Sequence, residues 1–254
     1  MTMLVVSMDH SPQEIPNDRN TWHTSVLLAS LSADQWGWNS VLGPLINPQG
    51  GKLRKWASRN AGRYKGEFRR HFPELLASNP VFGLALRVSG GAMVDCLPQI
   101  ITQFGLERSL LLSADKVRVV GVDSGEEFTI GTAQAAYVMY LSHFICRMHA
   151  LVLQSLAAED QSITWCDWQI SPDNFPQGVN GPMATLFSIV ANSAAGLGLV
   201  QGNLRVLTMV NGDPGVEICD NLAGMLREDF CNPPGSLRLV DSPAKGSLYW
   251  ERHG

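Results

Sequence analysis

The second half of this chain alternates between two hydrophobic patterns, and this alternation limits the fold more than any other feature. Short β-rich runs at 162–168 and 203–210 are each followed by a segment with helical periodicity, at 181–195 and 217–229. Strands that alternate with helices form crossover units, in which the strands lie parallel and the helices pack on the faces of the sheet. The second half therefore predicts an α/β sheet that is at least partly parallel.

The first half contains strand-like runs that lie closer together. Strands with little sequence between them favour an antiparallel meander. The expected strands cover residues 3–9, 24–31, 81–88 and 116–122, and the expected helices cover residues 52–77, 92–104 and 131–158. We therefore expect one mixed α/β domain over residues 1–254, in which helices flank a single mixed sheet. A basic helical insertion is expected at 36–78, and an irregular tail at 232–254 with one short strand at 248–250.

Three aspartates lie where expected elements begin or end. Asp9 follows the apolar run 3–8, Asp167 follows the run 163–166, and Asp220 lies in the first turn of the last helix. In a mixed α/β sheet, ligand sites gather at the carboxyl ends of strands, and carboxylates that converge there can hold divalent cations. Aspartate is also common at such places because it caps helices and turns. If the first strand is central and the strand at 162–168 adjoins it, the three carboxylates come within reach of one metal site.

Short motifs surround the first and last of these aspartates. The first reads Val5-Val6-Ser7-Met8-Asp9-His10-Ser11, and the last reads Glu217-Ile218-Cys219-Asp220-Asn221-Leu222-Ala223-Gly224. Together with Trp165-Cys166-Asp167 after the long helix, they resemble the RNase-H-like superfamily over about residues 3–229. The nearest likeness is to small prokaryotic domains that open with a strand-end Asp, often followed by Glu-Ser-Gly, and close with a helix reading Gln-x-x-Asp-x-x-Ala-Gly. This chain has His10 in place of that Glu and Glu217 in place of that Gln.

The resemblance implies an RNase-H-like fold and a metal-dependent nuclease that hydrolyses phosphodiester bonds in DNA or RNA. In the implied mechanism, two Mg²⁺ or Mn²⁺ ions activate a water and stabilise the leaving oxygen. Asp9 would bridge both ions, and Asp167 and Asp220 would each complete one metal site. Glu217 lies one helical turn before Asp220, so it is either a fourth metal ligand or a first-turn acid favoured by the helix dipole. Asp173 is a substitute ligand if the register of the middle strand differs.

Two other hypotheses remain open. The departures at His10 and Glu217 favour a non-catalytic subunit that uses the same fold to bind nucleic acid or protein. The segment Gly212-Asp213-Pro214-Gly215, followed by Asp220, resembles the metal-binding segment of haloacid-dehalogenase-type phosphatases. That family carries Asp-x-Asp at the end of its first strand, where this chain has Asp9-His10-Ser11, so we place the phosphatase after the nuclease.

A basic segment lies within the 36–78 insertion. It holds eight of the nineteen Lys and Arg residues, namely Lys52, Arg54, Lys55, Arg59, Arg63, Lys65, Arg69 and Arg70. Trp56, Tyr64 and Phe68 are interleaved with them. Cations neutralise phosphates and aromatic side chains stack on unpaired bases, so the segment predicts a nucleic-acid-binding surface. The alternative is a solvated amphipathic helix whose buried side contains Trp56 and Phe68.

The composition is that of a folded protein outside the membrane. With 45% hydrophobic and 17% charged residues the chain can bury a full core, and no uninterrupted apolar run of about 18 residues predicts a membrane span. The net charge of −4 gives no overall sign of a nucleic-acid-binding protein. The five cysteines form no C-x-x-C pair, so we expect buried free thiols and a cytoplasmic location.

The expected helix at 132–158 is apolar on nearly all sides. Such a helix is either deeply buried or part of an interface. We expect central packing with one side shared by a partner, either a second copy of this chain or another protein subunit. His143 and His149 lie six residues apart on it, which predicts packing rather than joint metal ligation. His10 differs because it adjoins Asp9 and could orient a water or a phosphate.

Overall fold

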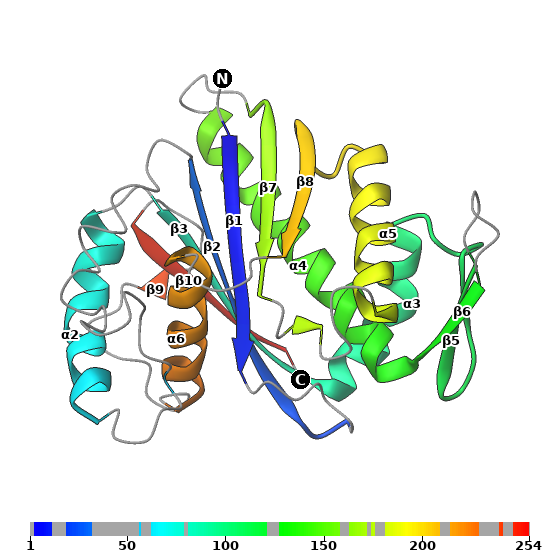
Figure 1. The fold of residues 1–254 in the computed structure, drawn as a ribbon, viewed down its shortest axis with the longest axis horizontal. Helices are drawn as coiled ribbons and strands as arrows, with labels where there is room; N and C mark the ends of the chain where they lie inside the picture. The colour runs from blue at the N-terminus through cyan, green and yellow to red at the C-terminus, as the bar shows by residue number, and fades with distance from the viewer. Residues whose placement is uncertain are drawn as a thin grey trace.

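The computed structural model describes most of the chain, and the account below is limited to that part. The described residues are 3–11, 19–31, 56, 62–78, 81–120, 127–157, 163–171, 174–175, 181–208, 214–228, 239–240 and 246–253. They form a mixed α/β structure with helices on both faces of a large sheet (Figure 1). The fold class expected from the alternation of strands and helices is therefore confirmed.

In the described part of the chain, the large sheet has seven strands in the order β8-β7-β1-β2-β3-β10-β9. β1 (Met3–Ser11) pairs antiparallel with β2 (Trp22–Leu31), and β2 pairs antiparallel with β3 (Val81–Ser89). On its other side, β1 pairs in parallel with β7 (Trp165–Ile170), which pairs in parallel with β8 (Asn203–Thr208). The meander and the parallel strands expected from the sequence thus lie on opposite sides of a central first strand.

The sheet extends further beyond β3 than expected. β10 (Ser247–His253) pairs in parallel with β3 and with the short strand β9 (Leu239–Val240). β10 is longer than the short strand expected at 248–250. The lack of a side chain at Gly83 allows β10 to lie close to β3. A Cβ at Gly83 would lie 2.8 Å from the Leu248 Cδ1 atom and 3.1 Å from the Ser247 carbonyl oxygen, so only glycine leaves room for β10 here.

Alternate residues of the strands point to two different hydrophobic layers. Leu4, Val6 and Met8 of β1 belong to the core beneath the helices α3 (Gly90–Gln103), α4 (Thr132–Ala157) and α5 (Pro182–Gly196). The opposite face packs against α2 (Gly62–Ser78) and α6 (Pro214–Glu228) through a second cluster that includes Val26, Phe68 and Leu222. Figure 1 shows these helices as layers on either side of the sheet. Asp9 therefore faces α6, whereas the next residue, His10, faces α4.

A separate three-stranded antiparallel sheet joins α3 to α4. It consists of β4 (Leu110–Leu112), β5 (Lys116–Val120) and β6 (Glu127–Gly131) in that order. Only the middle strand, expected at 116–122, is apparent from the sequence. The other two are short, and Leu111 and Leu112 of β4 are exposed, so neither strand has a run of core residues that would identify it. Val117, Val119 and Ile130 attach this sheet to the α4 core.

The long helix is central to the structure. α4 spans Thr132–Ala157, as predicted within one residue, and its window from Thr132 to Gln154 is long and apolar enough to cross a membrane. However, 72% of that window is buried inside the fold, which is typical of the core helix of a soluble protein. Burial on all sides thus explains the apolar pattern. Of the five cysteines, Cys146, Cys166 and Cys219 are buried free thiols as expected, and Cys96 is a half-buried free thiol.

Candidate functional site

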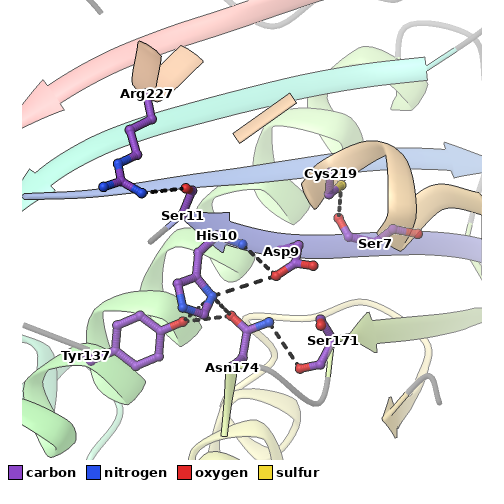
Figure 2. Close-up of polar contacts among 9 residues, drawn as sticks. All are labelled: Ser7, Asp9, His10, Ser11, Tyr137, Ser171, Asn174, Cys219 and Arg227. Carbon is purple, nitrogen blue, oxygen red and sulfur yellow. Dashed lines mark hydrogen bonds and ion pairs between the residues drawn. The ribbon is translucent and has the colours of Figure 1, made fainter. Parts of the chain in front are cut away.

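Asp9 lies near the carboxyl end of the central strand, on the face covered by α6. β1 continues to Ser11, so Asp9 is inside the strand rather than after it. Its side chain is almost completely buried, and its Oδ1 accepts a hydrogen bond of 2.8 Å from the His10 backbone N–H (Figure 2). The expectation that a carboxylate lies at this edge of the sheet, with β7 as the parallel neighbour of β1, is confirmed.

Asp167 lies nearer to the start of its strand than expected. It is the third residue of β7 and pairs with Val5 of β1, not with Asp9. The offset is four residues, or about 13 Å at 3.3 Å per residue. The prediction that Asp167 ends its strand was wrong because the alternation continues: Trp168 and Ile170 follow Cys166 into the core.

The Asp167 carboxylate is bound by an arginine on the neighbouring strand. Arg205 of β8 donates from Nε to Oδ1 at 2.7 Å and from Nη2 to Oδ2 at 2.6 Å. The carboxylate side chain is 4% exposed, and the guanidinium also lies over the Trp165 ring, 5.6 Å from its centroid. A bidentate guanidinium satisfies the carboxylate and supplies the positive charge that a metal ion would otherwise supply.

Asp220 lies in the second turn of α6. The helix begins at Pro214, so Glu217 is the acidic residue of the first turn, as the helix-dipole interpretation expects, and Asp220 comes one turn later. α6 runs beside β1 in the same direction: the Cys219 Sγ donates to the Ser7 carbonyl oxygen at 3.3 Å, and the Arg227 Nη1 donates to the Ser11 Oγ at 3.4 Å. Cys219, the residue before Asp220, therefore contacts the middle of β1.

The described residues contain no group of three His, Cys, Asp or Glu side chains arranged to hold a metal ion. Asp167 is not part of such a group because it is offset from Asp9 along the sheet and because Arg205 binds its carboxylate. Asp173, the substitute ligand, lies outside the described residues, as does Asp213 of the phosphatase-like segment.

On the other face of the same strand end, four buried side chains form a polar cluster that sequence analysis did not predict as a set. His10 Nδ1 donates to the Asn174 Oδ1 at 2.7 Å, and the Tyr137 hydroxyl donates to the same oxygen at 2.7 Å (Figure 2). The Asn174 Nδ2 donates to the Ser171 carbonyl oxygen at 3.1 Å, which fixes the orientation of the amide. His23 completes the cluster, with its ring centroid 5.9 Å from those of both His10 and Tyr137.

Burial sets the protonation states in this cluster. His23 is completely buried, and neither of its ring nitrogens has a hydrogen-bond partner among the described residues. Burial, and then the nearby His10 and Arg227, lower the pKa of His23 from 6.5 to about 3. Burial, helped by the charge of Asp9, raises the pKa of the Tyr137 hydroxyl well above 10. Both groups are therefore neutral at physiological pH, which suits a structural role.

The described part of the basic segment is mostly paired with acids. Lys65 and Arg69 of α2 both contact Glu228 of α6, and both lie 5.0 Å from the centroid of the Trp56 ring. Arg70 pairs with Glu67 of the same helix. Arg63 is placed only as a residue of α2, and Lys52, Arg54, Lys55 and Arg59 lie outside the described residues.

The aromatic residues of this segment are buried rather than offered to a ligand. Trp56 is 4% exposed and Phe68 is fully buried, as the amphipathic-helix alternative expects. Trp56 packs on Gly224 of the last motif, where an added Cβ would lie 2.6 Å from the indole ring. This contact gives a packing reason for the Ala-Gly pair that ends that motif.

His23, Tyr137 and Asn174 were missed because no local pattern connects them. His23 lies in β2, Tyr137 inside α4 and Asn174 after the end of β7, and Asn174 and His10 are 164 positions apart. A signal was available for Asp167, since Cys166, Trp168 and Ile170 alternate with Asp167 and Gln169 and so predict a longer strand. No protein family, curated protein or solved structure matches the chain, so geometry alone must support any functional conclusion.

Proposed function

We propose that this chain is a nucleic-acid-binding protein with an RNase-H-like fold that does not use Asp9, Asp167 and Asp220 as a joint catalytic metal site. The arrangement of elements supports the fold: β1 is central, the acidic strand β7 follows the long helix and adjoins β1 in parallel, and α6 packs along β1. These are the neighbours that the sequence resemblance requires.

The single observation that carries the non-catalytic part is the position of Asp167. Asp167 pairs with Val5, so it lies about 13 Å along the sheet from the level of Asp9. Two carboxylates this far apart cannot share a two-ion site, in which each Mg²⁺ ligand lies about 2.0–2.1 Å from its ion. The Arg205 guanidinium already holds both carboxylate oxygens. Binding of Mg²⁺ or Mn²⁺ at Asp167 would require breaking two charge-assisted hydrogen bonds.

Nucleic acid is favoured over protein as the partner because of the basic insertion. In the sequence, the eight cations of the segment between Lys52 and Arg70 are accompanied by a single acid, Glu67, and Lys65 and Arg69 both contact Glu228 of α6. Five further cations of the same segment, from Lys52 to Arg63, precede Lys65 in the sequence. A local cationic excess on a net-acidic protein attracts a polyanion without making the whole protein basic. We place the protein in the cytoplasm, with a second copy of the chain or another protein subunit as a candidate partner.

The test combines a binding and a cleavage assay on the purified full chain. Fluorescence anisotropy with labelled DNA and RNA oligonucleotides should show binding that weakens steeply with salt. A gel assay of the same oligonucleotides with millimolar Mg²⁺ or Mn²⁺ should show no cleavage. Absence of binding to every oligonucleotide at low salt contradicts the proposal.

The nuclease remains the second candidate, and the packing of α6 against the end of β1 is the observation that favours it. Asp9 and Asp220 come from these two neighbouring elements, and Asp9 is at the edge where ligands gather. If the wild type cleaves, the Asp9→Asn and Asp220→Asn variants should abolish cleavage, while Asp115→Asn, which changes an exposed carboxylate between β4 and β5, should not. Cleavage with that pattern would replace the non-catalytic proposal.

A further inference from the structure

The helix α2 buries its aromatic residues and exposes cations on its opposite side. Tyr64, Phe68 and Phe72 follow one side of the helix and belong to the hydrophobic cluster beneath α2 and α6. Gly66 and Arg70 each lie two positions from Phe68, which is a rotation of about 200° around the helix axis, and both are exposed. Figure 1 shows α2 at the left-hand edge of the structure. This side of α2 is therefore accessible to a large partner.

Arg70 is the most exposed of the three segment cations whose side chains the structure describes. Its side chain is 68% exposed, compared with 33% for Arg69 and 22% for Lys65. Arg70 contacts Glu67 and His71 of its own helix. Ion pairs between exposed side chains contribute little to stability, so a phosphate can replace the Glu67 carboxylate as the partner of Arg70 without disturbing the fold.

Gly66 leaves the centre of this exposed side without a side chain. An added Cβ at Gly66 would have no atom within 4 Å, so no packing contact accounts for a glycine inside the helix, where glycine is unfavourable. Arg69 and Arg70, three and four residues later, are its neighbours on the helix surface. Glu74 follows one turn after Arg70 and marks the end of the cationic side. A polyanion that approaches Gly66 therefore meets guanidinium groups with no intervening side chain.

The burial of the aromatic residues limits the kind of nucleic acid that this side of α2 can bind. Proteins that bind single strands stack bases on aromatic side chains in addition to contacting phosphates. Trp56, Tyr64 and Phe68, the aromatic residues of the basic segment, are all buried and cannot stack on a base. Phosphate contacts remain, and a duplex carries a charge about every 1.7 Å of its axis, compared with about 3.4 Å for one strand. A duplex is therefore the better partner.

We propose that Lys65, Gly66, Arg69 and Arg70 form a surface, the α2 face, that binds the sugar–phosphate backbone of a nucleic-acid duplex. This inference rests on the proposed function and names the class of nucleic acid. The segment from Lys52 to Arg70 has eight cations and one acid, so its charge is complementary to a polyanion. Phosphate contacts carry no base information, so recognition is independent of base sequence.

The test places a charge at Gly66 in the full chain, because an added Cβ there has no atom within 4 Å. Anisotropy with a labelled mixed-sequence duplex should show about fivefold tighter binding for Gly66→Lys and about fivefold weaker binding for Gly66→Glu. The slope of log affinity against log salt should steepen by about one in the first variant and flatten by about one in the second. Arg70→Gln should behave like Gly66→Glu.

The matched controls are Gly196→Lys and Gly196→Glu. Gly196 is the last residue of α5, on the opposite face of the large sheet, and an added Cβ there also has no atom within 4 Å. Both controls should bind the duplex like the wild type. The wild type should bind the duplex at least fivefold more tightly than either of its single strands, and DNA and RNA duplexes are measured in parallel. A thermal melt of each variant confirms that it is folded.

The outcomes separate the α2 face from the proposed function. If the wild type binds nucleic acid and the Gly66 and Arg70 variants bind equally well with unchanged salt slopes, the α2 face is wrong and the proposed function stands. Equal affinity for single strands and duplex overturns the duplex inference alone. If the wild type binds no nucleic acid, the proposed function fails and the inference fails with it. Competition by polyglutamate as strong as by a duplex of equal charge would assign the α2 face to an acidic polypeptide.

Discussion

The two faces of the sheet at the carboxyl end of β1 are built from adjacent residues but are chemically opposite. On the α4 face, His10, His23, Tyr137 and Asn174 are buried, and hydrogen bonds connect three of them. On the α6 face, Asp9 is a carboxylate and the Ser11 hydroxyl accepts a hydrogen bond from the exposed Arg227. Consecutive residues of a strand point to opposite faces, so one short motif serves both sides. The motif Asp9-His10-Ser11 therefore contributes His10 to the buried cluster on one face and Asp9 and Ser11 to the α6 face.

The largest effect should come from Asn174→Ala, which removes the acceptor shared by His10 and Tyr137. His10 Nδ1 can still donate to the Tyr137 hydroxyl, 3.1 Å away, but that hydroxyl loses its acceptor and the Ser171 carbonyl oxygen loses the Asn174 amide. At about 1–3 kcal/mol for each lost partner, we expect a loss of about 3 kcal/mol in the free energy of unfolding. Urea denaturation measures it. Nucleic-acid binding by the folded fraction should be unchanged, since the cluster lies on the other face. A loss below about 1 kcal/mol would show that the cluster is not structural.

Gly224→Ala should be the next most harmful change, and it affects the opposite face. The added Cβ would lie 2.6 Å from the Trp56 ring, so α6 or Trp56 must shift. Overpacking of this kind costs about 1–3 kcal/mol, measurable as a lower midpoint in urea. Because Gly66 has no atom within 4 Å of an added Cβ, Gly66→Ala on α2 is the matched control and should not destabilise. Equal stability of the two variants would contradict the packing described for Trp56.

The buried His23 on the α4 face predicts that the free energy of unfolding depends on pH. The pKa of His23 is about 3 in the folded state and near 6.5 when unfolded, so the unfolded chain takes up the proton first on acidification. The stability from neutral His23 is complete above pH 6.5 and falls as the pH drops towards 3. Between pH 7.5 and 5 the loss should be about 2 kcal/mol.

His23→Phe isolates this contribution from that of other groups. Burial also lowers the pKa of His149 to about 4, so part of the acid sensitivity will remain in the variant. The difference between wild type and His23→Phe in urea titrations at the two pH values should equal the His23 share. Parallel pH profiles for the two proteins would show that His23 is not buried as a neutral group.

The smallest effect on stability should come from Arg227→Gln. This exposed side chain makes one long hydrogen bond, to Ser11, so the free energy of unfolding should change by no more than about 0.5 kcal/mol. A thermal melt checks this. If the same variant weakens nucleic-acid binding while its stability is unchanged, the division of labour between the two faces is supported. A large loss of stability would show that Arg227 contributes to the stability of the fold.

Local patterns were enough to predict most of the sheet. The parallel order of β1, β7 and β8 follows from the alternation of strands and helices, and α4 and α5 were placed within one residue because their apolar periods are long. Strand register was harder, since it depends on pairing between distant segments. The position of Asp167 opposite Val5 decides the candidate site, and no local pattern shows which residue it pairs with.

The residues of the candidate surfaces were less predictable than the fold. The basic segment was evident from composition, but its pairing with Glu228 required the packing of α2 against α6. Arg87 and Arg252 are single cations in apolar strands, and only the contact between β3 and β10 makes them a pair. Long-range pairing, which the sequence does not encode locally, therefore determines both the arginine pair and the polar cluster.

The position of β10 has a consequence for synthesis of the protein. Its residues pair with β3, more than 160 positions earlier in the sequence, and so separate β3 from β9. During synthesis on the ribosome, the edge of β3 that pairs with β10 therefore stays unpaired until residues 247–253 have left the exit tunnel. Open strand edges invite pairing with other chains, and distant pairing slows folding. Ribosome-bound chains of this protein should depend on chaperones until the last strand of the sheet is inserted.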